Sequence, residues 1–509
     1  MPSTRPCELT IHELRPLIEK GDLDPRELLG DLLAQIEQLN PTLHAYIAIE
    51  PKRLHAMLED RLRRGPRGRL LGIPITVKDN LCVKGEETAC ASRILTAFRP
   101  PYTATAIERL IQEGALIVPR ANMDEFAFGS STETSHFGIT KNPWEPARVP
   151  GGSSGGSACA VASDLAVAAL GTDTGGSIRQ PAAFCGVVGL KPTYGRVSRY
   201  GLIAFASSLD AIGPITKDVT DCALLLSIIA GRDERDSTSA PVEVPDYVAS
   251  LEASVKGRRF GVPKEYFVEG GIEPEVKDAV EHAAQVLERL GMRRVAINLP
   301  HTTYAIATYY IVATAEASSN LARYDGVQYG YRATNGSGLR AQGSGQAHSP
   351  QPTAQSDLIE MYMRTRAEGL GAEAKRRIIL GTYVLSRGYY EAYYLKGLKV
   401  RTLIKQDFDE AFGQCDVIVC PTSPTASFRI GEKLDNPLQM YLSDIFTISA
   451  NLAGIPALSM PCGFTKGGLP IGLQLFAAPF EEARLLQVAY AYEQATEWHQ
   501  RQPAISSKQ

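Results

Sequence analysis

Hydrophobic residues follow two different patterns in the first quarter of the chain. Residues 8–39 carry them at helical spacing in two stretches, and Asp24 is suited to cap the second stretch because Pro25 then takes the first helical position. Residues 70–77 and 114–119 are short apolar runs rich in β-branched side chains, which is typical of strands, and a helical pattern directly precedes the second run. Strands that alternate with helices predict an α/β core.

Small apolar residues fill the run ACAVASDLAVAAL, which follows Ser157 and ends at Leu170. Alanine and valine lie on nearly every side of this stretch, so we expect a helix buried within the protein that ends at Gly171. Further α/β material follows: strand-like runs at 258–263, 293–300, 416–424 and 457–464, and a helix at about 274–290.

Composition and charge indicate a compact globular protein without a strongly basic surface. The 509 residues are 44% hydrophobic, and 53 Lys plus Arg stand against 56 Asp plus Glu, a net charge of −3. This balance does not favour direct binding of nucleic acid or of an anionic membrane. Residues 333–356 are rich in Gly, Ser, Gln and Pro without periodic apolar positions, so we expect a low-complexity surface loop there.

The nine cysteines indicate a reducing compartment. Their number is odd and no two form a Cys-x-x-Cys motif, so we expect reduced and mostly buried thiols. The N-terminal sequence is typical neither of a secretory signal nor of a transit peptide, and no apolar run reaches the roughly 20 residues of a membrane span. We therefore expect a cytoplasmic protein with no membrane contact.

Two glycine-serine loops are the strongest candidates for chemistry. The first reads GGSSGGS at 151–157 and the second TDTGGSIRQPA at 172–182. A phosphate-binding P-loop is excluded, since the chain has no Gly-Lys dipeptide, and flexible linkers do not normally flank buried stretches. Gly-x-Ser-x-Gly at 151–155 is preceded by three prolines in ten residues rather than by the strand that a nucleophile elbow requires. A serine hydrolase whose base is a lysine distant in sequence remains.

Both loops, followed by CGVVGLKPTYGRVSRYG, resemble the amidase signature family over essentially the whole chain. The resemblance implies a catalytic triad of Lys78 as base, Ser153 as a bridging serine in a cis peptide, and Ser177 as nucleophile. It also implies a single large α/β domain, 1–509, in which a mixed β-sheet is covered by helices on both faces. Within it, 1–65 is an N-terminal helical segment, 66–230 the signature core with the triad, and 231–509 the part with the substrate pocket.

The residue types suit this chemistry. A serine hydroxyl needs a base, and lysine can be that base only when burial lowers its pKa from about 10.4. The backbone N–H groups of Thr174, Gly175 and Gly176 are predicted to form the oxyanion hole. Asp173 and Arg179 are expected to hold this loop in shape as an ion pair, and Ser154 and Ser157 to hydrogen-bond backbone within their loop.

The C-terminal half resembles, within that family, the glutamine-hydrolysing subunits of tRNA-dependent amidotransferases. The similarity is carried by residues 309–321, 324–332, 373–408 and 440–444. It implies a glutamine pocket in which Arg377 binds the carboxylate, Asp444 pairs with the ammonium, and Tyr309 contributes, with Tyr310 nearly as suitable. Arginine can bind a carboxylate in bidentate fashion.

The same resemblance implies partners and a division of labour. A larger B subunit would bind mischarged Glu-tRNA(Gln), ATP and Mg²⁺, and a small C subunit would wrap between the two. No cofactor and no metal is expected in this chain. The alternative is a stand-alone amidase signature hydrolase that acts on another carboxamide.

Overall fold

The computed structural model describes residues 5–63, 68–267, 271–333 and 354–505. Within these residues, ten strands form one sheet in the order β2-β1-β3-β5-β4-β9-β10-β8-β6-β7. The strands are β1 Pro74–Lys78, β2 Leu116–Ala121, β3 Ala168–Asp173, β4 Val188–Lys191, β5 Ala211–Thr216, β6 Arg259–Pro263, β7 Arg293–Ile297, β8 Val417–Pro421, β9 Ala457–Phe464 and β10 Pro470–Phe476. The two ends of the sheet, β2-β1-β3 and β8-β6-β7, are parallel, and the pairs between them are antiparallel, so the predicted mixed α/β sheet is confirmed.

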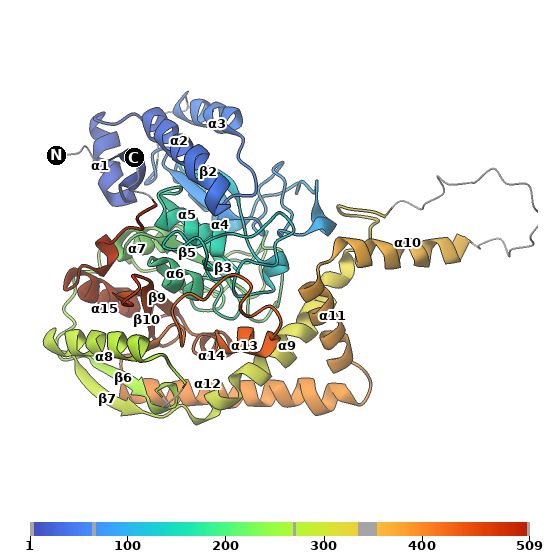
Figure 1. The fold of residues 1–509 in the computed structure, drawn as a ribbon. Coiled ribbons are helices and arrows are strands. Elements are labelled where there is room, and N and C mark those ends of the chain that lie inside the picture. The colour runs from blue at the N-terminus through green and yellow to red at the C-terminus, as the bar shows by residue number, and fades with distance from the viewer. Residues whose placement is uncertain (1–4, 64–67, 268–270, 334–353, 506–509) are drawn as a thin grey trace, which may run out of the picture.

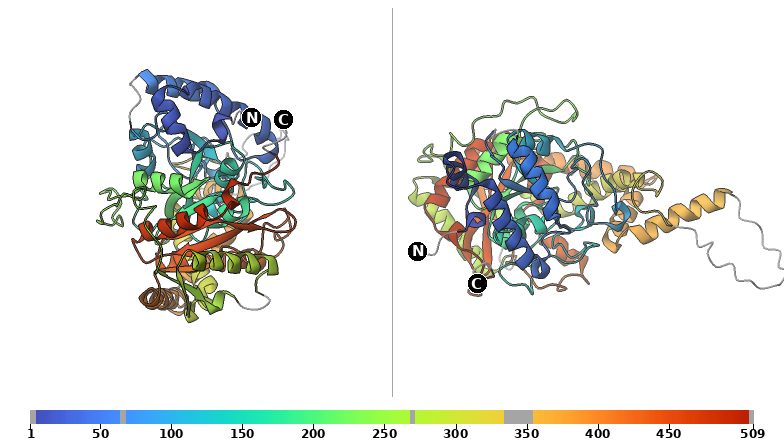
Figure 2. Two further views of the ribbon diagram at one scale, coloured as in Figure 1. Left: turned by 90° about the vertical axis from the view of Figure 1, so that its left-hand side faces the viewer. Right: turned by 90° about the horizontal axis from the view of Figure 1, so that it is seen from above.

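Helices surround this sheet, as Figures 1 and 2 show. They are α1 Ile11–Lys20, α2 Pro25–Leu43, α3 Pro51–Arg63, α4 Thr105–Gln112, α5 Gly155–Ala162, α6 Arg179–Cys185, α7 Val219–Ile229, α8 Pro274–Arg289, α9 Ala305–Asn320, α10 Ala354–Gly369, α11 Ala372–Val384, α12 Lys396–Gln414, α13 Pro437–Leu442, α14 Ile448–Ala453 and α15 Glu482–Gln494. As predicted, Asp24 caps α2, accepting a hydrogen bond from the Arg26 N–H, and Pro25 is the first helical residue.

The two faces of the sheet contribute to different cores, because successive strand side chains point in opposite directions. In β3, Ala168 and Leu170 join the core under α4, α7, α8 and α15, whereas Ala169 joins the core under α2, α5 and α6. A third core lies under α9, α12 and α14. Helices therefore cover both faces.

The prediction of one helix between Ser157 and Leu170 is wrong in its second half. The helix α5 ends at Ala162, and the chain then turns through Asp164, whose φ is 57°, before residues 168–173 form the strand β3. Every residue of this stretch is buried, so its composition has no polar side that could distinguish a helix from a central strand. Gly171 lies inside the strand rather than at a helix end.

Three further expectations concerned the thiols, the low-complexity segment and a membrane span. All nine cysteines are buried and unpaired, as predicted. The segment 333–356 falls mostly outside the described residues, and its last three residues begin α10. No helix in the described part of the chain is both long enough and apolar enough to cross a membrane.

Candidate active site

The carboxyl ends of two neighbouring parallel strands bring the predicted catalytic segments together. Lys78 is the last residue of β1, and the loop 174–177 follows β3, which pairs with β1. Because parallel strands end at the same edge of a sheet, the amine and the loop reach the same place. The other glycine-serine loop ends where α5 begins, and its Ser154 N–H donates to the Ser177 carbonyl at 3.0 Å. Both loops therefore border one site.

Lys78 is fully buried, and its amine is surrounded by hydroxyl groups. Its Nζ lies 2.7 Å from Ser153 Oγ, 2.8 Å from Ser154 Oγ and 3.0 Å from Thr172 Oγ1. Ser154 Oγ in turn donates to the Thr172 carbonyl at 3.1 Å, and Asn80 Nδ2 donates to Thr172 Oγ1 at 3.0 Å. Among the described residues, the hydrogen bonds of this amine run to hydroxyl and carbonyl oxygens and to no carboxylate.

Burial controls the protonation of this amine. It lowers the pKa of Lys78 from 10.5 to about 7, although the charges of Asp124 and Asp173 act in the opposite direction. Removing an ammonium from water disfavours its charged form, and hydroxyl neighbours compensate for this loss less than a carboxylate in direct contact would. Near neutral pH, a large fraction of Lys78 is therefore the free amine that a general base requires.

The loop that carries Ser153 packs against the buried residue Asp124. The peptide bond between Gly152 and Ser153 is cis. Asp124 Oδ2 accepts the Thr132 N–H at 2.9 Å, and the Asp124 N–H donates to the Ser153 carbonyl at 3.3 Å. A side-chain carbon at Gly152 would lie 2.1 Å from Asp124 Oδ2, so only glycine fits at this position.

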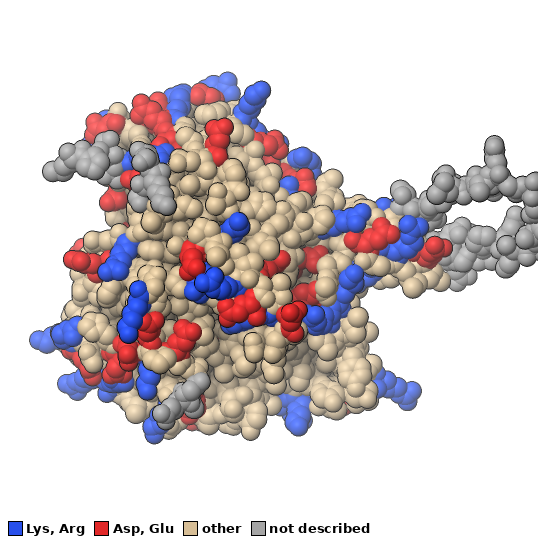
Figure 3. All heavy atoms as spheres, viewed as in Figure 1, with Lys and Arg blue, Asp and Glu red and all other residues tan. Residues whose placement is uncertain are grey.

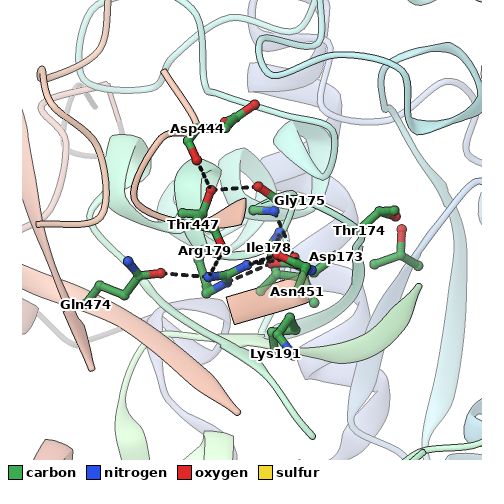
Figure 4. A network of polar contacts seen from close by, with 12 residues as sticks. Asp173, Thr174, Gly175, Ile178, Arg179, Lys191, Asp444, Thr447, Asn451 and Gln474 are labelled. Carbon is green, nitrogen blue, oxygen red and sulfur yellow. Dashed lines mark hydrogen bonds and ion pairs between the residues drawn. The ribbon is translucent and has the colours of Figure 1, made fainter. Parts of the chain in front are cut away.

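The loop that carries Ser177 is held by a buried ion pair, shown in Figure 4. Arg179 donates from Nε and Nη2 to the two Asp173 oxygens, each at 3.0 Å, and both side chains are fully buried. Asp173 also accepts the N–H groups of Gly176 at 2.9 Å and Ile178 at 3.1 Å. The predicted ion pair is confirmed. The Gly176 N–H is engaged in this structure, so its predicted role at the oxyanion requires that it leave Asp173.

The same network reaches the segment that contains Asp444. Arg179 Nη1 donates to the Thr447 carbonyl at 3.0 Å, and Thr447 Oγ1 lies within hydrogen-bond distance of the carbonyl oxygens of Gly175, at 2.6 Å, and Asp444, at 3.0 Å. Asn451 on α14 bridges the ion pair, since it bonds both Arg179 and Asp173. The nucleophile loop and the predicted ammonium-binding segment are therefore connected through Thr447.

A cavity of about 230 Å³ opens beside this network. Its lining includes Arg377 and Glu373 of α11, Phe128 and Ser130 of the loop after β2, and Tyr441 of α13. Arg377 is almost completely buried, and its Nε donates to Glu373 Oε1 at 2.8 Å. Burial opposes its charge, but Tyr310 and Glu373 hold the pKa of Arg377 above its ordinary value. A permanently charged guanidinium thus faces a small cavity.

Asp444 contacts the lining of the cavity, and Tyr309 contacts the nucleophile loop. Asp444 accepts a hydrogen bond from Ser130, which lines the cavity, and its Oδ1 is buried with no hydrogen-bond partner among the described residues. Burial raises the pKa of Asp444 to about 7. Tyr309 lies against Gly175, where an added side-chain carbon would come within 2.7 Å of the phenol oxygen. Tyr310 instead stacks on Tyr441, with ring centroids 3.9 Å apart.

One cluster of potential metal ligands occurs among the described residues, and it does not involve these loops. His12, Asp218 and Asp221 have ligand atoms within 4.8 Å of one another. Their groups already serve the chain: Asp221 accepts the N–H groups of Ile11 and His12, and Asp218 caps α7. The cluster therefore joins α1 to α7.

The fold, the two glycine-serine loops and the buried lysine define an amidase: residues 27–486 match the model of the amidase family, and the chain belongs to that family. Two relatives indicate which members of the family this chain is similar to in sequence. The chain is 57% identical to the A subunit of glutamyl-tRNA(Gln) amidotransferase from Thermodesulfovibrio yellowstonii, over 98% of this chain and 99% of the relative. It is 55% identical to the subunit of the same name from Syntrophus aciditrophicus, with 98% and 99% coverage.

Solved structures agree with this comparison. The crystal structure of the A subunit of glutamyl-tRNA(Gln) amidotransferase from Thermotoga maritima superposes with a TM-score of 0.78 and 43% identity, covering 97% of this chain and 96% of that one. The peptide amidase from Stenotrophomonas maltophilia has a TM-score of 0.78 and 31% identity, with 96% and 97% coverage. The fold is therefore shared by amidases that differ in their substrates.

Sequence reasoning missed several residues that surround the site. Asp124 supports the Ser153 loop, Thr172 contacts Lys78, Ser130 contacts Asp444, and Glu373 contacts Arg377. The only signal for Thr172 was its place at the start of the second glycine-serine loop. Asp124 and Ser130 stand in stretches with no distinctive pattern. Glu373 begins the segment 373–408 that carries the family resemblance, but nothing in that segment distinguishes this residue from its neighbours.

Proposed function

We propose that this chain hydrolyses glutamine to glutamate and ammonia, as the A subunit of a glutamyl-tRNA(Gln) amidotransferase that converts Glu-tRNA(Gln) to Gln-tRNA(Gln). The near-full-length similarity to proteins of that name supports the overall reaction. The observation that carries the chemistry is the fully buried Lys78 amine, 2.7 Å from Ser153 Oγ and beside the loop that contains Ser177.

The hydrogen bonds around Lys78 support a proton relay with a defined direction. A neutral amine has two N–H donors and one lone pair. Ser154 uses its own proton toward the Thr172 carbonyl, and Thr172 Oγ1 already accepts from Asn80, so both hydroxyl oxygens suit the two N–H donors. The lone pair is then left for the Ser153 hydroxyl proton. In this arrangement Ser153 gives its proton to Lys78 and takes the proton of Ser177.

Ser177 then attacks the carboxamide carbon. Its Oγ forms the new C–O bond, and the developing oxyanion is stabilised by the backbone N–H groups of Thr174 and Gly175, joined by that of Gly176 once it leaves Asp173. The tetrahedral intermediate collapses as Lys78 returns the proton, through Ser153, to the leaving nitrogen, which releases ammonia. Water, activated by the same base, hydrolyses the acyl-enzyme to glutamate.

The cavity and the buried Asp444 behind its Ser130 provide complementary charges for a free amino acid. Arg377 is the cation for the α-carboxylate and Asp444 the anion for the α-ammonium, while Tyr309 lies against Gly175 on the side of the reacting amide. Glutamine carries its amide at the end opposite to these two charges, so binding them directs the amide toward Ser177. Tyr310 is the weaker candidate because it stacks on Tyr441.

Partner subunits would supply the remaining activities. We infer a B subunit that binds the mischarged tRNA, ATP and Mg²⁺, and a C subunit that stabilises the pair, all in the cytoplasm. Lys, Arg, Asp and Glu are interspersed over the face shown in Figure 3, which fits RNA binding by a partner. Nine unpaired cysteines fit a reducing compartment. Large apolar side chains are exposed on α10 and α11, among them Met363 at 64% and Ile379 at 68%, and a partner subunit would cover them.

The test of the reaction is release of ammonia from glutamine by the chain purified with co-expressed subunits. Ser177→Ala should lower the rate by at least about 10³-fold, because the nucleophile is lost. Ser157→Ala is the matched control, since Ser157 lies in a glycine-serine loop but bonds the Leu170 carbonyl. Full activity of Ser177→Ala would refute the assignment of the nucleophile. Rapid turnover of apolar amides but not of glutamine would favour the stand-alone hydrolase.

A further inference from the structure

Glu373 occupies a central position among the charged groups of the cavity. It lies in the first turn of α11, one helical turn before Arg377, so both side chains extend from the same face. Its Oε1 accepts from Arg377 Nε at 2.8 Å and from the Tyr441 hydroxyl at 3.2 Å, and its Oε2 pairs with Arg376. The side chain is 12% exposed and lines the cavity. Both carboxylate oxygens are therefore engaged by named partners.

This contact fixes the orientation of the Arg377 guanidinium. The faces of the group are enclosed by aromatic rings whose centroids lie 5.3–5.7 Å from Cζ. These rings are Phe128, Phe205, Tyr310 and Tyr441. Glu373 takes the Nε edge, and no described residue accepts a hydrogen bond from Nη1 or Nη2 of Arg377. The two Nη groups are left as a pair of parallel donors, which is the geometry that a carboxylate binds in bidentate fashion.

The charges of Glu373 and its two arginine partners also favour a carboxylate ligand. Arg376 and Arg377 contribute two positive charges and Glu373 one negative charge, so the three side chains leave a net charge of about +1 when all are ionised. A single carboxylate ligand would neutralise this charge. Without Glu373, the net charge would rise, but the Nε edge would be free to compete with the Nη pair and the guanidinium could rotate.

We propose, on the basis of the glutamine hydrolysis proposed above, that Glu373 is a positioning residue that makes the pocket specific for substrates with an α-carboxylate, by presenting the Nη pair of Arg377. The proposal separates orientation from charge. If Glu373 mattered only through its charge, removing that charge would strengthen carboxylate binding. Because it acts through orientation, Glu373→Met, which removes the acceptor for Arg377 Nε, weakens carboxylate binding although the pocket becomes more positive.

The test compares two ligands that differ in one group. Glutamine carries the α-carboxylate, and 4-aminobutanamide keeps the ammonium and the amide but lacks the carboxylate. Binding is measured in the full chain with its co-purified subunits, in a Ser177→Ala background that prevents turnover, by calorimetry for glutamine and by ligand-observed NMR at millimolar concentration for 4-aminobutanamide. Glu391→Met, an exposed substitution of the same type, is the matched control.

Glu373→Met removes the charge-assisted hydrogen bond to Arg377 Nε, which predicts that it weakens glutamine binding by about 10-fold to 100-fold, while 4-aminobutanamide changes by less than about 2-fold. In an Arg377→Met background the same substitution should have almost no further effect, because the residue acts through that arginine. Unchanged or tighter glutamine binding would overturn the proposal, and so would a loss that persists without Arg377. An equal loss for both ligands would also overturn it, since it would indicate a collapsed pocket.

These outcomes are distinct from failure of the proposed function. If the Ser177→Ala chain binds glutamine and Arg377→Met abolishes that binding, the pocket is correct whatever Glu373 does. If Ser177→Ala and the unsubstituted chain both fail to bind glutamine, the proposed substrate is wrong, and Glu373 then has no carboxylate to select.

Discussion

The protonation of Lys78 predicts the pH dependence of the chemical step. The base must be neutral, and burial lowers its pKa to about 7, so the rate should rise with pH and level off above 8. A group with this pKa is about 9% neutral at pH 6 and about 91% neutral at pH 8, which predicts a rise of about 10-fold. At the ordinary lysine pKa, only about 0.03% would be neutral at pH 7, so burial increases the active form by about 10³-fold.

The assay is kcat for ammonia release at saturating glutamine, measured from pH 5.5 to 9, so that changes in substrate affinity do not enter. Lys78→Arg supplies the control, because a guanidinium remains protonated throughout this range. It should lose about 10²–10⁴-fold in kcat, the usual contribution of a general base, and its profile should lack the inflection near 7. A flat profile between pH 6 and 8 for the unsubstituted chain, or a rise only above pH 9, would refute the role given to burial.

Three further outcomes are expected. The KM for glutamine should fall as pH rises through about 7, because the Asp444 carboxyl ionises there and only the carboxylate pairs with an ammonium; a KM that is independent of pH, or that is unchanged in Asp444→Asn, would contradict this. Arg179→Met should lower the free energy of unfolding by about 3–5 kcal/mol in denaturant titrations, because Asp173 is left as a buried, unpaired charge, and a loss below about 1 kcal/mol would argue against the network. Gly175→Ala should raise KM and lower kcat together, since the new methyl group meets the Tyr309 ring, and normal kinetics would place the substrate elsewhere.

The catalytic segments could be predicted from the sequence because short loops carry them. Lys78 ends an apolar run and the two glycine-serine loops are visible as patterns, but it was the resemblance to the amidase signature family that assigned them to one triad. In the structure, Lys78 and the second loop lie at the same edge of the sheet. The stretch after Ser157 shows the limit of this reasoning. Where every side chain is buried, hydrophobic periodicity vanishes, and the change from α5 to β3 leaves no signal except the Ser-Asp turn between them.

The residues of the substrate pocket were harder to predict from the sequence. Arg377 belongs to a Lys-Arg-Arg run on a helix, and its neighbours Lys375 and Arg376 are exposed, as that pattern alone would suggest for all three. Only contacts made by distant segments bury Arg377 beside aromatic rings of other elements. The same holds for Asp124, whose importance depends on the loops that contain Ser131 and Ser153.

Because all nine cysteine thiols are buried, we expect no reaction between the native chain and thiol reagents. A maleimide should label it only as it unfolds, so the labelling rate becomes a direct measure of opening. A cysteine introduced on the exposed side of α11, for instance Ile379→Cys, would be the single reactive thiol of the folded protein. A fluorophore attached there would lie among the exposed apolar side chains of α11 and report the binding of another polypeptide.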